Sequence, residues 1–138
     1  MTLEPDDTAE LTELGEGATQ PQGKLETFPN HHVDRDYLVE LDTEEFTCLC
    51  PVTGQPDFAD IRICYVPDER LVESKSLKLY LWSYRDKGIF HEHFANVLLE
   101  DLVEALSPRW CEVEAKFNPR GGIGITVTAE HGAKPATQ

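Results

Sequence analysis

A cysteine and an aspartate share one short segment of this chain and together could carry covalent chemistry. Residues 50–57 read Cys-Pro-Val-Thr-Gly-Gln-Pro-Asp, and their two prolines and one glycine predict a loop. A loop thiol such as Cys50 is accessible enough to act as a nucleophile. Asp57 closes the same segment and could turn its carboxyl toward the sulfur as a proton donor, given partial burial. Taken singly, an unreactive thiol and a turn or capping aspartate are the commoner roles of these residue types.

Two glutamates lie where predicted helices carry apolar side chains. Glu73 shares a helix face with Leu77 and two tyrosines, which is costly for a carboxylate unless it is paired or stands at the helix start. Glu92 follows His91 at the edge of the apolar face of the next predicted helix, where a capping role is the alternative. Carboxylates from two adjacent helices would suit the ring N–H and amino donors of a purine-like base.

Three basic residues are candidates for binding the phosphates of a cofactor. Lys75 and Lys78 lie on one predicted helix, and Arg120 precedes Gly121 and Gly122, which would allow a phosphate close to the backbone. The chain lacks a Gly-x-Gly-x-x-Gly motif, so a dinucleotide would bind outside a Rossmann unit. The alternative for these residues is an ordinary solvated face.

Metal binding is not favoured by the spacing of the ligand-type residues. His91 and His93, and Cys48 and Cys50, are each separated by one residue, which matches no common zinc pattern. We expect no metal site.

The elements that must position these residues follow from hydrophobic periodicity. Residues 37–41 and 61–65 read as strands, residues 73–85 and 90–106 as helices, and residues 111–117 and 123–129 as alternating strands. This order, strand-strand-helix-helix-strand-strand, predicts an α+β fold in which both helices cover one face of an antiparallel sheet.

Length and charge limit the class of protein further. The 138 residues suit a single domain over residues 31–138, preceded by a flexible acidic tail over residues 1–30. A net charge of −14 argues against direct nucleic-acid binding. We see neither a membrane span nor a signal peptide, so we expect a cytoplasmic protein with free thiols. So short a chain builds an enclosed site more easily with a neighbouring subunit, so we expect a homo-oligomer.

Taken together, these segments resemble the QueF-type nitrile reductases of the unimodular type. The similarity extends over residues 34–130. It is carried by residues 73–84 (Glu-Ser-Lys-Ser-Leu-Lys-Leu-Tyr-Leu-Trp-Ser-Tyr), residues 46–57 (Phe-Thr-Cys-Leu-Cys-Pro-Val-Thr-Gly-Gln-Pro-Asp), residues 90–92 (Phe-His-Glu) and residues 118–122 (Asn-Pro-Arg-Gly-Gly).

The resemblance implies a fold and an activity. The family has the tunnelling fold of GTP cyclohydrolase I, with sites between subunits, and reduces 7-cyano-7-deazaguanine to 7-aminomethyl-7-deazaguanine with NADPH, a step toward the tRNA base queuosine. It implies that Cys50 forms a covalent thioimide and that Asp57 donates the proton, with Cys48 a bystander. The implied substrate contacts are Val72, Glu73, Ser74, His91 and Glu92.

Two other functions stay open from the sequence. One is a zinc-dependent pterin or purine cyclohydrolase on the same fold. The other is a non-catalytic oligomer that binds a base.

Overall fold

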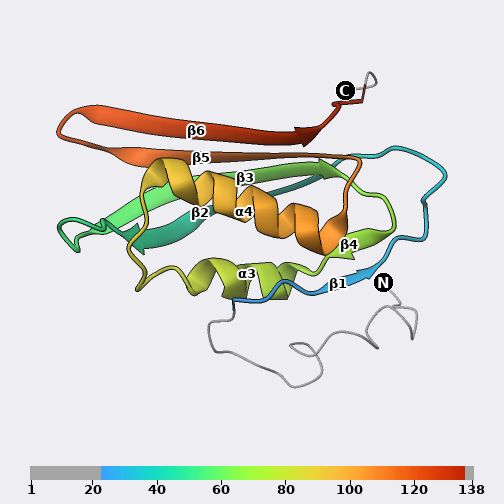
Figure 1. Ribbon diagram of the computed structural model, residues 1–138, viewed down its shortest axis with the longest axis horizontal. Helices are drawn as coiled ribbons and strands as arrows, with labels where there is room; N and C mark the ends of the chain where they lie inside the picture. The colour runs from blue at the N-terminus through green and yellow to red at the C-terminus, as the bar shows by residue number, and fades with distance from the viewer. Residues whose placement is uncertain (1–22, 136–138) are drawn as a thin grey trace.

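Eight strands and helices make up the part of the chain that the computed structural model describes, residues 23–135. In chain order they are β1 (Thr27–Pro29), β2 (Val39–Leu49), β3 (Pro56–Val66), β4 (Arg70–Val72), α3 (Ser74–Trp82), α4 (His91–Leu106), β5 (Trp110–Arg120) and β6 (Ile123–Gly132). β2, β3, β5 and β6 form an antiparallel sheet in that order, and β1 pairs with β4 in a separate ribbon. Both helices lie over the same face of the sheet (Figure 1). The predicted α+β arrangement, with two helices on one face of an antiparallel sheet, is confirmed.

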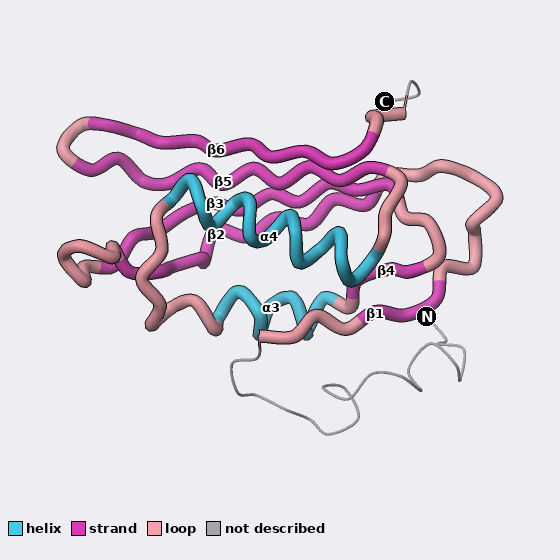
Figure 2. The backbone as a smooth tube through the Cα atoms, viewed as in Figure 1, coloured by secondary structure: helices cyan, strands magenta, loops and turns pink. Residues whose placement is uncertain are grey.

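Alternation along the strands creates the face that the helices cover. In β5, Cys111, Val113, Ala115 and Phe117 are buried, while Glu112 and Glu114 between them are half-buried and Lys116 is exposed. The same period of two runs through β3, where Ala59, Ile61 and Ile63 are buried. The sheet therefore has one apolar face and one polar face, and its two outer strands are β2 and β6 (Figure 2).

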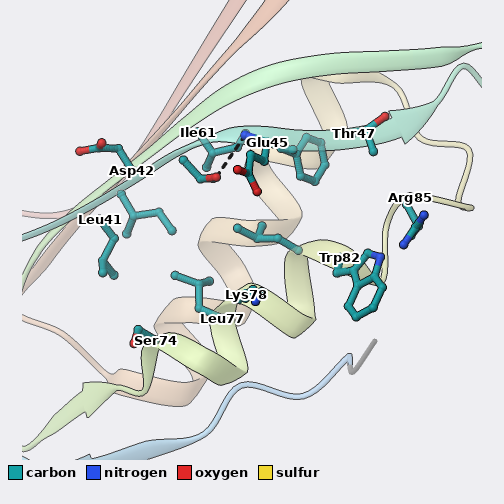
Figure 3. Close-up of a pocket in the computed structure, with 14 residues that line it drawn as sticks. Leu41, Asp42, Glu45, Thr47, Ile61, Ser74, Leu77, Lys78, Trp82 and Arg85 are labelled. Atoms are coloured by element: carbon teal, nitrogen blue, oxygen red, sulfur yellow. Dashed lines mark hydrogen bonds between the residues drawn. The ribbon is translucent and has the colours of Figure 1, made fainter. Parts of the chain in front are cut away.

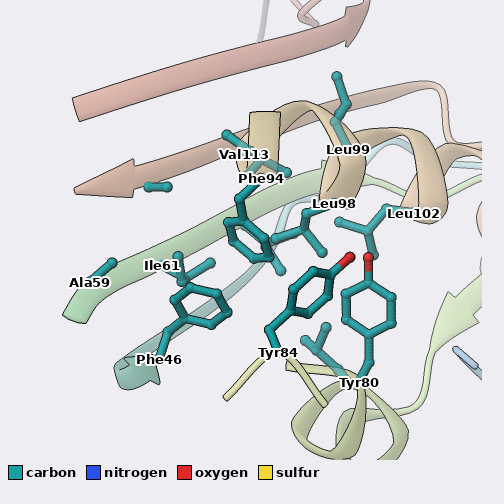
Figure 4. Close-up of a cluster of buried hydrophobic side chains, with 14 of the residues drawn as sticks. Phe46, Ala59, Ile61, Tyr80, Tyr84, Phe94, Leu98, Leu99, Leu102 and Val113 are labelled. Atoms are coloured by element: carbon teal, nitrogen blue, oxygen red, sulfur yellow. The ribbon is translucent and has the colours of Figure 1, made fainter. Parts of the chain in front are cut away.

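An aromatic cluster joins the helices to the sheet. The ring of Phe94, fully buried on α4, stacks on Phe46 of β2 with centroids 4.2 Å apart. Tyr84 meets Phe94 edge-on at 5.0 Å, and Leu98 and Leu102 continue the apolar face of α4 (Figure 4). Large rings packed at these distances add to simple burial of apolar area, so this cluster is a major source of the domain's stability.

The two hairpin strands extend beyond the predicted ranges. β2 continues to Leu49 through the polar run at residues 42–45, where a bulge between Thr43 and Phe46 keeps the apolar residues inward. β3 already begins at Pro56, so the turn spans residues 50–55 only. The prediction that Asp57 lies in the loop is therefore wrong; it is a strand residue opposite Cys48, because hairpin pairing overrides the loop-like composition.

The helices agree with the prediction to within a few residues, but the boundary of the domain does not. Residues 1–30 were predicted to form the tail, yet Thr27–Pro29 pairs with β4, and Glu26 and Asn30 are 5% and 7% exposed. The backbone carbonyl of Glu26 accepts a bond from the Glu73 N–H at 2.8 Å. The domain thus includes residues 26–30, because this segment pairs with β4 and supplies the carbonyl that accepts the Glu73 N–H at the start of α3. The tail prediction for residues 1–22 lies outside the described residues.

Within residues 23–135, no helix is both long and apolar enough to cross a membrane.

Loss of the central ring should cost more stability than loss of a surface ring. We expect Phe94→Ala to lower the free energy of unfolding by about 3–5 kcal/mol, because it leaves a cavity beside Phe46 and Tyr84. The matched control is Phe90→Ala, a ring that is 51% exposed, for which we expect a loss of about 0.5 kcal/mol or less. Urea denaturation at one protein concentration measures both, and equal losses would contradict this account of the core.

Candidate active site

Cys50 stands at the first position of the turn that joins β2 to β3. The turn is closed by bonds from the Cys50 N–H to the Gln55 carbonyl and from the Gly54 N–H to the Cys50 carbonyl, both 2.8 Å, with Gly54 in the left-handed region at φ 75°. The backbone N–H of Thr53 points at the sulfur at 3.5 Å. Hydrogen bonds from the side chain and backbone of Thr53, and from the Val52 backbone, lower the pKa of the Cys50 thiol. The nucleophile predicted from the sequence is thus a half-buried thiol with a lowered pKa.

The other three cysteines are buried, and their thiol pKa values are raised. Burial is the main cause that raises the pKa of Cys48 to about 11 and that of Cys111 to about 12, and it also raises the pKa of Cys64. All four are free thiols. Of the four cysteines, Cys50 alone has a lowered pKa, so we expect it to be the most reactive thiol.

Asp57 is nearly inaccessible and is held by groups from two other elements. It is 4% exposed. One carboxylate oxygen lies 3.1 Å from His91 Nε2, and the other accepts a bond from the Arg120 guanidinium. Its backbone carbonyl accepts from the Thr47 hydroxyl at 2.8 Å. The carboxylate is thus fixed within the same hairpin as Cys50.

His91 is the first residue of α4, and its ring orientation is set by packing. The imidazole stacks on Phe117 of β5 at 3.8 Å with an interplanar angle of 6°. This stacking leaves Nε2 facing Asp57. Phe117 was not predicted to belong to the site; its inward position in an alternating strand was the available signal. Glu92, the next residue, is exposed in the first turn of α4.

Arg120, which was predicted to bind a cofactor phosphate, forms an ion pair with Asp57. Besides Asp57, its guanidinium donates to Gln55 Oε1 at 2.5 Å and to the Pro56 carbonyl at 3.2 Å. These contacts tie the β5–β6 hairpin to the β2–β3 turn. Arg120 therefore enters the site as the partner of the acid, an arrangement that the sequence analysis missed because the two residues are 63 positions apart.

The predicted residues around the start of α3 form a second group. Glu73 is the N-cap, and its carboxylate accepts from the Lys75 N–H at 2.8 Å and the Ser76 N–H at 2.7 Å. Its burial, at 7% exposed, is therefore compensated by backbone donors. Val72 beside it is buried, whereas Ser74 is exposed.

The group around Cys50 and Asp57 and the group around Glu73 lie toward opposite ends of α3 (Figure 1). The segment after α3 contacts the hairpin, since Leu49 N–H donates to the Lys87 carbonyl at 2.9 Å and Ile89 N–H to the Leu49 carbonyl at 3.1 Å. Glu73 stands at the other end of this nine-residue helix, about 13 Å away at 1.5 Å per residue. Figure 1 shows the start of α3 beside β4 and its end toward the β2–β3 turn. One chain alone therefore does not bring all predicted substrate-contacting residues together.

A groove of about 610 Å³ runs between α3 and the outer strand β2. Ser74 and Lys78 line it, together with Leu41, Phe46 and Trp82 (Figure 3). It includes neither Cys50 nor Asp57, so the candidate nucleophile and the candidate acid lie outside this groove. Of the remaining predicted cofactor residues, Lys78 is exposed and Lys75 is half-buried.

Ligand-type side chains do not gather into a metal site within residues 23–135. No group of three His, Cys, Asp or Glu residues there has the geometry to hold an ion.

The fold and the hairpin define a class: a tunnelling-fold domain with an activated thiol beside a buried carboxylate. A family model described as QueF-like protein matches residues 56–136. The chain is 66% identical over 127 residues to a relative from Syntrophus aciditrophicus, covering 92% of this chain and 90% of that one. It is 58% identical over 114 residues to one from Bacillus subtilis, covering 83% and 68%. Both are named NADPH-dependent 7-cyano-7-deazaguanine reductase.

A solved structure, that of the archaeosine synthase QueF-Like in its apo form, matches with a TM-score of 0.65 and 31% identity, over 71% of this chain and 96% of that one. The chain belongs to the QueF family.

The environment of Cys50 predicts selective modification by iodoacetamide. We expect Cys50 to react first among the four thiols, with a pH midpoint below that of an ordinary cysteine, because the thiolate persists above its lowered pKa and is lost as the pH falls through it. Thr53→Val should move the midpoint upward, whereas Thr53→Ser, which keeps the hydroxyl, should not. Mass spectrometry of peptides after timed labelling measures this; faster labelling of Cys48, Cys64 or Cys111 would refute it.

Proposed function

We propose that this chain is an NADPH-dependent oxidoreductase that reduces the nitrile of 7-cyano-7-deazaguanine to the aminomethyl group, through a covalent thioimide on Cys50. The observation that carries the proposal is the Cys50 thiol with its lowered pKa in the same hairpin as the buried Asp57. Identity of 58–66% to relatives named for this reaction supports it. The reaction would take place in the cytoplasm, as a step toward the tRNA base queuosine.

The first step follows from the polarity of the nitrile. The Cys50 thiolate adds to the nitrile carbon, forming a C–S bond, while the nitrogen takes a proton from Asp57; the triple bond becomes a C=N double bond. The thioimide is more electrophilic than the nitrile. It can therefore accept a hydride, whereas the nitrile is a poor acceptor.

The later steps release the sulfur. Hydride addition to the thioimide carbon is followed by cleavage of the C–S bond, which returns the thiolate and leaves an imine. A second hydride and a proton give the amine, so the balance is one nitrile, two NADPH and two protons to one amine and two NADP⁺. NADPH supplies both hydrides; the protein supplies position and charge.

Residues of two groups would hold the substrate and cofactor. His91 and the exposed Glu92 lie at the start of α4 next to the acid, where the carboxylate of Glu92 could accept from a purine-like ring N–H and amino group. Lys75 and Lys78 on α3 have the charge for cofactor phosphates. Val72, Glu73 and Ser74 would complete the site for the substrate.

We infer that the complete site forms between subunits of a homo-oligomer. The β2–β3 turn that carries Cys50 and the N-cap residue Glu73 lie toward opposite ends of α3 in one chain (Figure 1). Apart from the bridge between Leu49 and Gly88, the outer strands β2 and β6 have no further strand beside them within the described domain, so a neighbouring copy could extend the sheet. In such a ring, the hairpin of one subunit would meet the start of α3 of the next.

The covalent step can be tested without cofactor. Protein mixed with 7-cyano-7-deazaguanine should gain the mass of the substrate on Cys50, with a new absorbance, and should oxidise two NADPH per substrate once NADPH is added. Cys50→Ala should give no adduct, Asp57→Asn should slow adduct formation by about 10²–10⁴-fold, and Cys64→Ala, which changes a thiol in a separate cluster, should behave as wild type. The proposal is wrong if wild-type protein forms no adduct and consumes no NADPH. Stoichiometric zinc in the purified protein would favour a cyclohydrolase instead.

The shared site can be tested by mixing two inactive variants. Co-expressed Cys50→Ala and Glu73→Gln chains should recover about a quarter of wild-type activity, because one site in four would join an intact Cys50 to an intact Glu73 from different subunits. Each variant expressed alone should be inactive, with circular dichroism confirming that α3 is retained. No recovery in the mixture would place the whole site within one chain.

A further inference from the structure

The segment between the two helices, residues 83–90 (the α3–α4 linker), lies against the turn that joins β2 to β3. The linker is joined to the end of β2 through Leu49, whose backbone N–H donates to the Lys87 carbonyl at 2.9 Å and whose carbonyl accepts from the Ile89 N–H at 3.1 Å. Leu49 and Gly88 thus form an isolated parallel bridge. The linker and the turn lie at the same end of the domain (Figure 1).

Gly88 lies too close to the turn for an ordinary side-chain contact. A Cβ added there would be 3.1 Å from Pro51 Cα, 3.5 Å from Pro51 Cβ and 3.7 Å from the Pro51 nitrogen. The nearest of these is a backbone atom, which cannot rotate away as the end of a flexible side chain could. Gly88 does not have a positive φ, so glycine is needed here for the close approach and not for the conformation of the chain.

The linker is also held on the side away from the turn. The Lys87 N–H donates to the Tyr84 carbonyl at 3.0 Å, which ties the residue before Gly88 to the end of α3. Ile89, the residue after it, is partly buried against the hydrophobic core. The turn has less support of this kind, since its apolar residue Val52 is 78% exposed. Added bulk at Gly88 should therefore displace the turn more than the linker.

This contact lies between the candidate nucleophile and the start of α4. Cys50 directly follows the Leu49 end of the bridge, and α4 begins two residues after Ile89. The turn is closed by its own hydrogen bonds, so it would move as one unit with the sulfur. The distance from the sulfur to a substrate held at the start of α4 therefore depends on how closely the linker packs on the turn.

We propose that the α3–α4 linker aligns the Cys50 sulfur with the nitrile carbon, and that Gly88 is the positioning residue of this contact. Gly88 does not touch the substrate in this scheme; its missing side chain lets the turn lie where the thiolate can form the C–S bond. The scheme rests on the function proposed above. Misplacement by about 1 Å can slow a reaction about 100-fold. The shift of a few tenths of an ångström that a Cβ at Gly88 requires should therefore be measurable.

The kinetic test compares two glycine-to-alanine variants. Gly88→Ala should form the adduct with 7-cyano-7-deazaguanine about tenfold more slowly than wild type, because its Cβ pushes the turn out of line. Gly124→Ala on β6 is the matched control, since Gly124 also lacks a positive φ and its added Cβ would meet Pro119 Cγ at an ordinary 3.7 Å. The control should form the adduct within about twofold of the wild-type rate.

Two further measurements separate alignment from a change in the thiol or in binding. Iodoacetamide needs no fixed orientation, so it should label Cys50 in Gly88→Ala within about twofold of the wild-type rate. Binding of 7-cyano-7-deazaguanine, measured by calorimetry in a Cys50→Ala background, should also change less than about twofold when Gly88→Ala is added.

Three results of these measurements would overturn the proposal. One is an adduct rate in Gly88→Ala equal to that of wild type. Another is a parallel fall in the iodoacetamide rate, because the variant would then have altered the thiol itself. The third is a loss of binding as large as the loss of adduct rate.

A measurement on wild-type protein decides the case in which Gly88→Ala does not fold. The amide hydrogens of Leu49 and Ile89 should exchange with solvent at least about 100-fold more slowly than in an unfolded chain, because both are bonded in the bridge. Weaker protection would mean that the linker does not hold the turn, and the proposal would be wrong.

The same experiments separate this proposal from the reductase function. If wild-type protein forms no adduct while both amides are protected, the proposed reaction fails and only the structural contact remains. If wild-type protein forms the adduct and Gly88→Ala matches its rate, the reaction stands and the positioning role of Gly88 fails.

Discussion

The pairing register of β2 with β3 is the constraint on which the site depends. Cys48 stands opposite Asp57, so the two strands continue past the polar run of β2 and leave a six-residue turn that begins at Cys50. A slip of one residue would turn Asp57 to the other face of the sheet, away from His91 and Arg120. The bulge between Thr43 and Phe46 maintains this register, because it allows Phe46 to reach Phe94 while the turn keeps its hydrogen bonds.

Much of this architecture could be predicted from the sequence, since it depends on local periodicity. The two helices, the alternating β5 and β6, and Cys50 as the accessible thiol follow from residue spacing alone. The lengths of β2 and β3 did not, because residues 42–45 and Pro56 look like loop and are strand only through pairing with a neighbour. The segment at residues 26–30 was assigned to the tail for a similar reason: its order comes from α3 and β4, which lie more than 40 positions away.

The candidate site, like the fold, could be predicted only in part from the sequence. The residue types were recognisable, but their partners were not, since the contacts of Asp57 come from α4 and β5. Glu73 illustrates the reverse case: its position on an apolar face suggested a ligand-binding carboxylate, whereas the first turn of α3 already engages both of its oxygens. A substrate contact at Glu73 must therefore share this carboxylate with the helix start, or involve the neighbouring backbone.

The distance along the chain between Asp57 and Arg120 also bears on how the protein folds. The β2–β3 and β5–β6 hairpins are local structures that can form early, whereas pairing of β3 with β5 must close a long segment of chain that contains both helices. Closing a loop of that length costs entropy, which is repaid when the aromatic cluster packs. A partly folded chain with both hairpins complete would carry an accessible thiol but no guanidinium over its acid. The ion pair between Asp57 and Arg120 therefore forms only with the last long-range closure of the fold.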